Sequence, residues 1–282
     1  MDNKSISMNK IMNIVKSAYE YYNLKISDIT VFDLKNLFFT DDLYESVSKI
    51  QQDTNLILKD NLTNGCVVFP NDSNKLASPV MFLRTQNLDM SNMLIAFFHE
   101  LVHIEDFYKF AEYKNISKIK EMKNYENFCL WSEFHAFYSE NLYTYKFVDF
   151  SNNTNDFESM EHVYVENLAA YLYRERKRVF QNGEILYYDI SRILGRIAFP
   201  DIYDKVVDTD CSYIYEYLKE FFPQESQFEK VNSLYRFYVQ VLRDGDILDR
   251  LNVFFSDFYF EFIVTVFHYI TFFILMWSGG VV

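Results

Sequence analysis

The sequence contains few of the residues that interrupt regular structure. Only six of its 282 residues are glycine and only four are proline. Low-complexity and repeat-type chains are usually much richer in these residues, so both classes are disfavoured. Half of the residues are hydrophobic, which is enough apolar material for a sizeable core. We therefore expect one compact domain over residues 1–282.

Cysteine is also scarce. The three cysteines, Cys66, Cys129 and Cys211, are far apart in the sequence and odd in number. Neither a disulfide framework nor a CxxC metal site is therefore predicted. The first residues, MDNKSISMNKIMNIVK, lack the apolar run of a signal peptide. We predict a cytoplasmic protein whose thiols are reduced.

The chain has no excess of positive charge. Its formal net charge is −13. A nucleic-acid backbone attracts clustered lysine and arginine, so a nucleic-acid partner is not expected. One basic run, RERKR at residues 174–178, is interpreted as a solvated face of a helix.

Apolar spacing in the first part of the chain predicts both helices and strands. Residues 8–23 and 41–52 carry apolar residues at helical intervals. Short apolar runs at 66–69 and 79–83 are separated by a polar, turn-rich segment. These two runs predict the strands of a small antiparallel sheet.

The rest of the chain is predicted to be mainly helical. One helix is expected to begin after an N-cap at Asp89 or Ser91, and a second to cover about residues 130–145. Residues 151–159 are polar and resemble a linker. Further helices are expected from about residue 157 to the end, with breaks near Gly183, Pro200, Pro223 and Gly245. The predicted fold class is α+β.

The last helical candidate, residues 253–277, is apolar enough to raise the question of a membrane. Its uninterrupted apolar run is shorter than the ~20 residues that a span requires. Its polar residues fall on one stripe of the helix, and two of them are carboxylates, each of which would cost roughly 2.5–3.5 kcal/mol in lipid. The stripe consists of Asp257, Glu261, Thr265, His268 and Thr271. We predict a buried helix, with a C-terminal membrane anchor as the alternative.

The stretch HELVH, residues 99–103, has the spacing of a metal site. With about 100° of rotation per helical residue, His103 lies about 40° and Glu100 about 100° from His99. Both imidazoles can then bind one ion, with the glutamate beside the position of a metal-bound water. Chance produces such a motif in roughly one chain in a hundred. However, polar groups in an apolar helix require partners, and a metal would satisfy all three. We predict zinc bound by the histidines, with Glu100 as general base.

A site of this kind needs a third protein ligand. Glu133, between the apolar Trp131 and Phe134, is the first candidate. Asp106 is the alternative, because it lies at about −20° on the HELVH helix and could bind the ion or hydrogen-bond an imidazole. Glu140, two turns after Glu133, is expected either to support the ligands from behind or to take no part in the site.

Two neighbouring residues are expected to take no direct part in the site. His135 is turned about 200° away from Glu133 on the same helix, so one helix cannot present both side chains to one ion. Glu105 is expected to be a surface charge. The remaining histidines, His162 and His268, are expected to be structural.

At these motifs the sequence resembles gluzincin-type zinc metallopeptidases. HELVH and the segment SEFHAFYSE at 132–140 are similar to the two motif helices of ImmA/IrrE-like peptidases of phages and mobile elements. The similarity covers about residues 60–145. It implies a zincin-like metal-binding core at about 61–148 and leaves the helical C-terminal region at about 157–282 without a counterpart.

The resemblance also implies roles for individual residues. Zinc would be bound by His99, His103 and Glu133, and Glu100 would be the general base. The strand at 79–83 would be the sheet edge that pairs with an extended peptide substrate.

The predicted function is zinc-dependent hydrolysis of peptide bonds in a peptide or protein substrate. Two alternatives remain. One is a zincin-fold interaction module that binds a partner without turnover, and the other is a membrane-anchored peptidase that uses residues 253–277.

Overall fold

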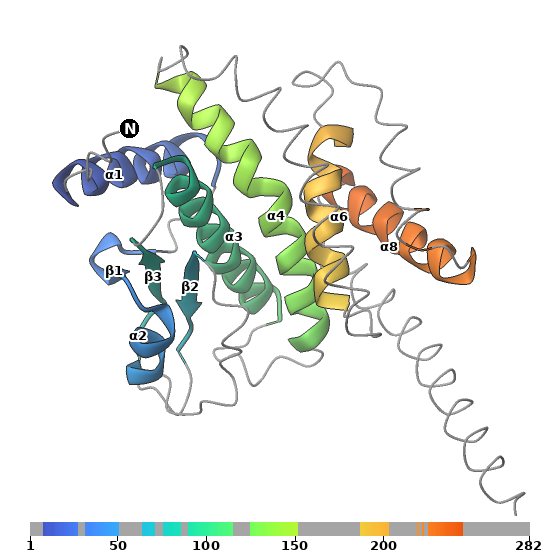
Figure 1. Ribbon diagram of the computed structural model, residues 1–282, viewed down its shortest axis with the longest axis horizontal. Coiled ribbons are helices and arrows are strands. Elements are labelled where there is room, and N and C mark those ends of the chain that lie inside the picture. The colour runs from blue at the N-terminus through green and yellow to red at the C-terminus, as the bar shows by residue number, and fades with distance from the viewer. Residues whose placement is uncertain are drawn as a thin grey trace, which may run out of the picture. The chain divides into compact units, whose positions relative to one another are not determined.

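In the residues that it describes, the computed structural model is mainly helical and contains a three-stranded sheet (Figure 1). By their internal contacts the residues divide into two compact units, 1–236 and 237–282, and the prediction of a single domain stays a prediction. The structure describes residues 8–27, 32–50, 64–70, 76–85, 90–114, 125–151, 187–202, 219, 222 and 225–244.

The first helix, α1 (Met8–Lys25), packs on the helices that carry the candidate site. Its buried residues Ile11, Val15, Ala18 and Tyr22 are spaced by three or four, so they form one apolar stripe. Helix α2 (Leu43–Ile50) buries Leu43 and Val47 in the same way. Both helices were predicted from the sequence.

The sheet is mixed, which corrects the prediction of an antiparallel sheet. Strands β2 (Gly65–Val68) and β3 (Val80–Arg84) are antiparallel neighbours, as expected. Strand β1 (Leu37–Thr40) was not predicted and runs parallel to β3. Only Leu37 of its four residues is buried, so β1 lacks the alternation that indicates a strand from sequence.

The strand order β1-β3-β2 also corrects the expected substrate edge. Strand β3 lies in the centre and is hydrogen-bonded on both sides, so it cannot receive a peptide strand. Its consecutive buried residues Val80, Met81, Phe82 and Leu83 are typical of a strand that is covered on both faces.

Two long helices follow the sheet and pack side by side (Figure 1). Helix α3 (Met90–Lys114) contains HELVH and also contacts β2 and β3. Its apolar residues contribute to a core with α1 and the sheet. Helix α4 (Tyr125–Phe150) extends beyond the predicted range 130–145 at both ends.

Two more helices complete the described part of the chain. Helix α6 (Tyr187–Ile202) packs along α4. It continues through Pro200, where a break was predicted. Because a proline removes only one N–H donor, the helix can continue past it, and its described part reaches Ile202. Helix α8 (Glu225–Asp244) is the last described element, and the break predicted near Gly245 lies outside the described residues.

Several predictions cannot be compared with the structure. The basic run 174–178, the apolar segment 253–277, and residues Asp89, His162 and Cys211 lie outside the described residues. Among the described residues, Cys66 and Cys129 are not joined in a disulfide. None of the described helices combines the length and apolar character that a membrane span requires.

Candidate metal centre

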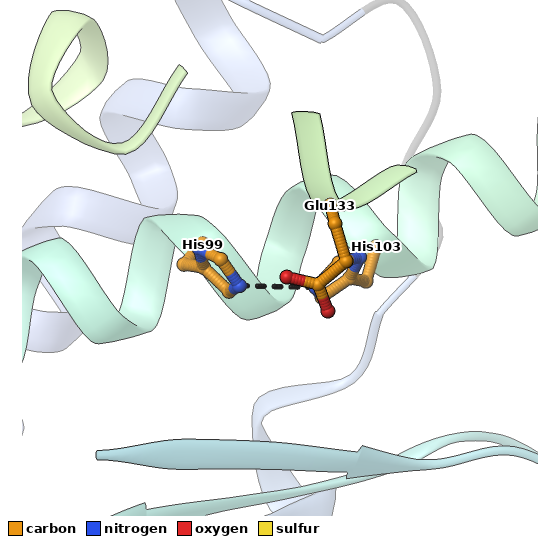
Figure 2. A group of neighbouring side chains, drawn as sticks. All are labelled: His99, His103 and Glu133. Atoms are coloured by element: carbon orange, nitrogen blue, oxygen red, sulfur yellow. Dashed lines mark hydrogen bonds and ion pairs between the residues drawn. The ribbon is translucent and has the colours of Figure 1, made fainter. Parts of the chain in front are cut away.

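The structure brings His99, His103 and Glu133 together between α3 and α4 (Figure 2). The two histidines lie one turn apart on α3, and Glu133 approaches from α4. His99 Nε2 and His103 Nε2 are 3.0 Å apart, and His103 Nε2 is 3.6 Å from Glu133 Oε1. One ligand atom of each residue lies within 4.8 Å of the others, so the group could hold a metal ion.

The far side of the His99 ring is held by a buried carboxylate on α4. His99 Nδ1 lies 2.8 Å from Glu140 Oε2, and the Glu140 side chain is 4% exposed. A carboxylate accepts, so the ring proton must be on Nδ1. The lone pair of the neutral ring is therefore on Nε2 and points toward the other two members of the group.

The far side of the His103 ring is held through a hydroxyl group. His103 Nδ1 lies 2.7 Å from Ser132 Oγ, and Ser132 donates its proton to Asp106 Oδ2 at 3.0 Å. A hydroxyl has one proton, so Ser132 Oγ must accept from His103 Nδ1–H. The lone pair of His103 is thus also on Nε2.

Two lone pairs that face each other at 3.0 Å repel unless a cation separates them. A proton on one ring is one solution. Burial lowers the pKa of His103 to about 3. Burial opposes charge on His99 too, but its hydrogen bond to Glu140 and the charge of Glu140 raise its pKa overall. A divalent metal ion is the other solution, and it would be shared by both rings.

The donor atoms also fit a metal ion in number, type and spacing. Metal–nitrogen bonds of about 2.0–2.1 Å in a tetrahedral arrangement place ligand atoms about 3.3 Å apart. The observed separations of 3.0 and 3.6 Å lie on either side of that value. The carboxylates of Glu100, Glu133 and Glu140 give the surroundings a negative charge that favours a cation.

Glu100 faces strand β2. Its carboxylate accepts a hydrogen bond from the backbone N–H of Val67. Arg84 N donates to Asn64 O at 2.8 Å, so in this antiparallel pair the backbone groups of Gly65 and Val67 point away from β3. Burial raises the pKa of Glu100 to about 7, with further increases from Glu133 and Glu140. A pKa near neutrality suits a general base.

Gly65 allows Glu100 to lie this close to the strand. A Cβ atom at residue 65 would be 2.8 Å from both Cγ and Oε1 of Glu100. These distances are shorter than the normal contact distance of a Cβ atom, so any residue larger than glycine would displace the Glu100 carboxylate.

Asp106, the alternative ligand, is placed behind the histidines and not among the three grouped donors. It accepts from Ser132 and from His135 Nδ1, which lies 2.8 Å from Asp106 Oδ1. The His135 ring stacks on Trp131. The hydrogen bonds thus run from His135 to Asp106, and from Asp106 through Ser132 to His103. His135 therefore serves Asp106 and not the metal group, which agrees with its predicted rotation away from Glu133.

The expectation for Glu105 was wrong. Its side chain is buried, accepts a hydrogen bond from Tyr22 and pairs with Lys109. The predicted surface position followed from its rotation away from the histidines. That face of α3 is instead covered by α1, which carries Tyr22.

Ser132 and Gly65 are functional candidates that sequence reasoning did not identify. Ser132 directly precedes Glu133 and would have been found by asking which neighbour could hold the second imidazole. Gly65 follows Asn64 at the start of a strand, where the Asn-Gly pair would ordinarily indicate only a turn.

Comparisons of the chain with protein-family models, curated proteins and solved structures gave no match.

Proposed function

We propose that this protein is a zinc-dependent peptidase. The observation that carries the proposal is the grouping of His99, His103 and Glu133 within reach of one ion, with the Glu100 carboxylate close enough to interact with His99 and Glu133. Two imidazoles and one carboxylate are a donor set that zinc prefers in catalytic sites. Zinc bound there would polarise a carbonyl group and lower the pKa of a coordinated water to about 7.

The residues of the chain would then handle the proton and the substrate. Glu100, with its pKa near 7, takes a proton from the attacking water and delivers it to the leaving amine nitrogen as the peptide C–N bond breaks. Glu140 and Ser132 hold the two rings in the tautomer that leaves both Nε2 atoms available to the ion.

Strand β2 replaces β3 as the proposed guide for an extended peptide. The N–H and C=O groups of Gly65 and the C=O of Val67 point away from β3 toward the sheet edge, whereas the N–H of Val67 already donates to Glu100. A peptide that aligns along this side of β2 would bring a backbone carbonyl next to Glu100 and the metal ligands. Pairing of this kind gives affinity through main-chain hydrogen bonds.

The proposal is tested by metal analysis and hydrolysis on the same preparations. Wild-type protein should contain about one zinc per chain, and it should cleave members of a mixed peptide library. Glu100→Gln should retain the zinc and lose cleavage by about 10²–10⁴-fold. Glu45→Gln, which changes an exposed carboxylate on α2, is the matched control and should behave as wild type.

The outcomes separate the candidate functions. Folded wild-type protein without metal would overturn the proposal. Zinc binding without cleavage of any library peptide would favour the interaction module. In that case Glu100→Gln should leave partner binding unchanged, since turnover would not be required.

A further inference from the structure

Helix α6, which lies outside the region that resembles known peptidases, packs directly against the metal-binding part of α4. Gly195 permits the approach. A Cβ atom at that residue would lie 2.3 Å from the backbone oxygen of Phe134 and 2.8 Å from Cβ of Phe137. The backbone of α6 therefore rests on α4 within one turn of Glu133 and within two turns of Glu140.

The next residue of α6 reaches the carboxylate that holds His99. Arg196 Nη2 lies 3.4 Å from Glu140 Oε1, while His99 Nδ1 uses the other oxygen, Oε2. The guanidinium carbon also lies 4.8 Å from the centre of the Phe137 ring. That ring in turn packs edge-on against His99, with 4.7 Å between the ring centres.

We propose that Arg196 is a positioning residue of the metal centre. It acts on the ion through Glu140 and His99, and the proposal rests on the metal binding put forward above but not on hydrolysis. With one oxygen on Arg196 and the other on His99, the Glu140 carboxylate has a fixed orientation. The His99 imidazole is held at Nδ1 by Glu140. It also makes a T-shaped contact with the Phe137 ring, which Arg196 covers.

Charge supports the same assignment. Glu140 is almost fully buried, and a buried carboxylate without a cationic partner is strongly unfavourable. Arg196 supplies that cationic partner at Oε1, and His99 occupies the other oxygen of the carboxylate.

A second effect of Arg196 has the opposite sign. A cation near a metal site also repels the ion, so removing it would raise the metal affinity if that repulsion dominated. Because Glu140 lies between Arg196 and His99 in the order of contacts, we expect the loss of orientation to dominate.

The test measures zinc affinity by competition with a chromophoric chelator, on the full chain and without a substrate. Arg196→Gln should weaken zinc binding about tenfold, the lower end of the range for outer-sphere partners. Arg196→Lys keeps the charge and should restore part of the loss. Lys49→Gln removes a positive charge from an exposed pair on α2 and should bind zinc as wild type does. Unchanged or increased affinity in Arg196→Gln would overturn the proposal.

A double-mutant cycle with Glu140 separates positioning from general structural support. In a Glu140→Gln background the buried charge is gone, so Arg196→Gln should cause no additional loss of zinc affinity. An additive loss would show that Arg196 acts through the fold alone and would contradict the proposal. This comparison also decides the matter if Arg196→Gln by itself does not fold, since the double variant leaves no buried carboxylate unpaired.

The result is independent of whether the protein cleaves peptides. Zinc binding that depends on Arg196 without any hydrolysis would reject the peptidase and keep the inference. If the wild-type protein cleaves peptides and Arg196→Gln binds zinc as wild type does, the peptidase proposal stands and the inference about Arg196 is rejected.

Discussion

The two histidines of the candidate centre are held by very different surroundings. His99 is supported by a carboxylate, Glu140, which is itself paired with Arg196. His103 is supported by a neutral hydroxyl, Ser132, backed by Asp106. Accordingly the pKa of His99 is raised by Glu140 against the effect of burial, whereas burial lowers the pKa of His103 to about 3.

The difference shows that one geometric result can be reached by two chemical routes. Both supports place the ring proton on Nδ1 and leave Nε2 to the ion. Only the His99 support places a carboxylate in direct hydrogen-bond contact with the ring, which makes that imidazole the better electron donor. We therefore expect the two sides to respond unequally to substitution.

The largest effect should come from removing the ligand that both sides share. Glu133→Ala takes away the only carboxylate among the three grouped donors. We expect zinc affinity to fall by more than about 100-fold, beyond the range for outer-sphere partners. Glu45→Ala on the surface of α2 is the control. If Glu133→Ala still bound zinc tightly and Asp106→Ala did not, Asp106 would be the third ligand.

A second variant should leave both histidines untouched and affect only chemistry. In Gly65→Ala the new methyl group would displace the end of the Glu100 side chain, which is flexible enough to move without unfolding the protein. A displacement of about 1 Å at a reacting group can cost about 100-fold in rate. We expect a loss of peptide cleavage of that order, with zinc affinity as in wild type. A parallel loss of zinc would mean that β2 supports the ligands as well.

The comparison between the two sides is tested directly by Ser132→Ala and Glu140→Gln. Ser132→Ala leaves His103 Nδ1–H without its acceptor, and we expect about a tenfold loss of zinc affinity. Glu140→Gln removes a charge-assisted hydrogen bond, which is roughly twice as strong as a neutral one. Its effect should be the larger of the two. The reverse order would show that the hydroxyl relay matters more than the charge.

The smallest effect should come from His135, one contact further from the ion. His135→Phe keeps the stacking on Trp131 but removes the hydrogen bond to Asp106. We expect a decrease of about 1–3 kcal/mol in the free energy of unfolding, and a change in zinc affinity below that of Ser132→Ala. His135→Asn, which retains a donor near the position of Nδ1, is the matched control. An effect on zinc as large as that of Ser132→Ala would place His135 among the necessary supports.

The sequence was most informative where function depends on local helical geometry. The rotation between His99, Glu100 and His103 follows from the α-helix alone, so their common face could be predicted. Glu133 was identified because a carboxylate between Trp131 and Phe134 was unusual for an exposed helix. The structure places it 3.6 Å from His103 Nε2.

The errors and omissions that bear on the candidate site and the sheet involve contacts between distant segments. The pairing of β1 with β3 joins residues more than forty positions apart, and nothing in LFFT indicates a parallel partner. Glu105 was assigned to the surface because the cover provided by α1 is not visible on a helical projection. Arg196 lies 56 positions after Glu140, and one arginine on a helix carries no sign of its partner.

Helix α4 supplies more to the centre than a ligand. Ser132, Glu133 and Glu140 all come from this one helix, and they meet residues of α3 that are themselves fixed one turn apart. If α4 slid or turned by a single residue along α3, the third donor and both imidazole partners would be lost together. If the group binds zinc as proposed, zinc affinity would report the register of the two helices. We expect a substitution anywhere in the contact between α3 and α4, even far from the ion, to weaken metal binding at a level of destabilisation too small to cause measurable unfolding.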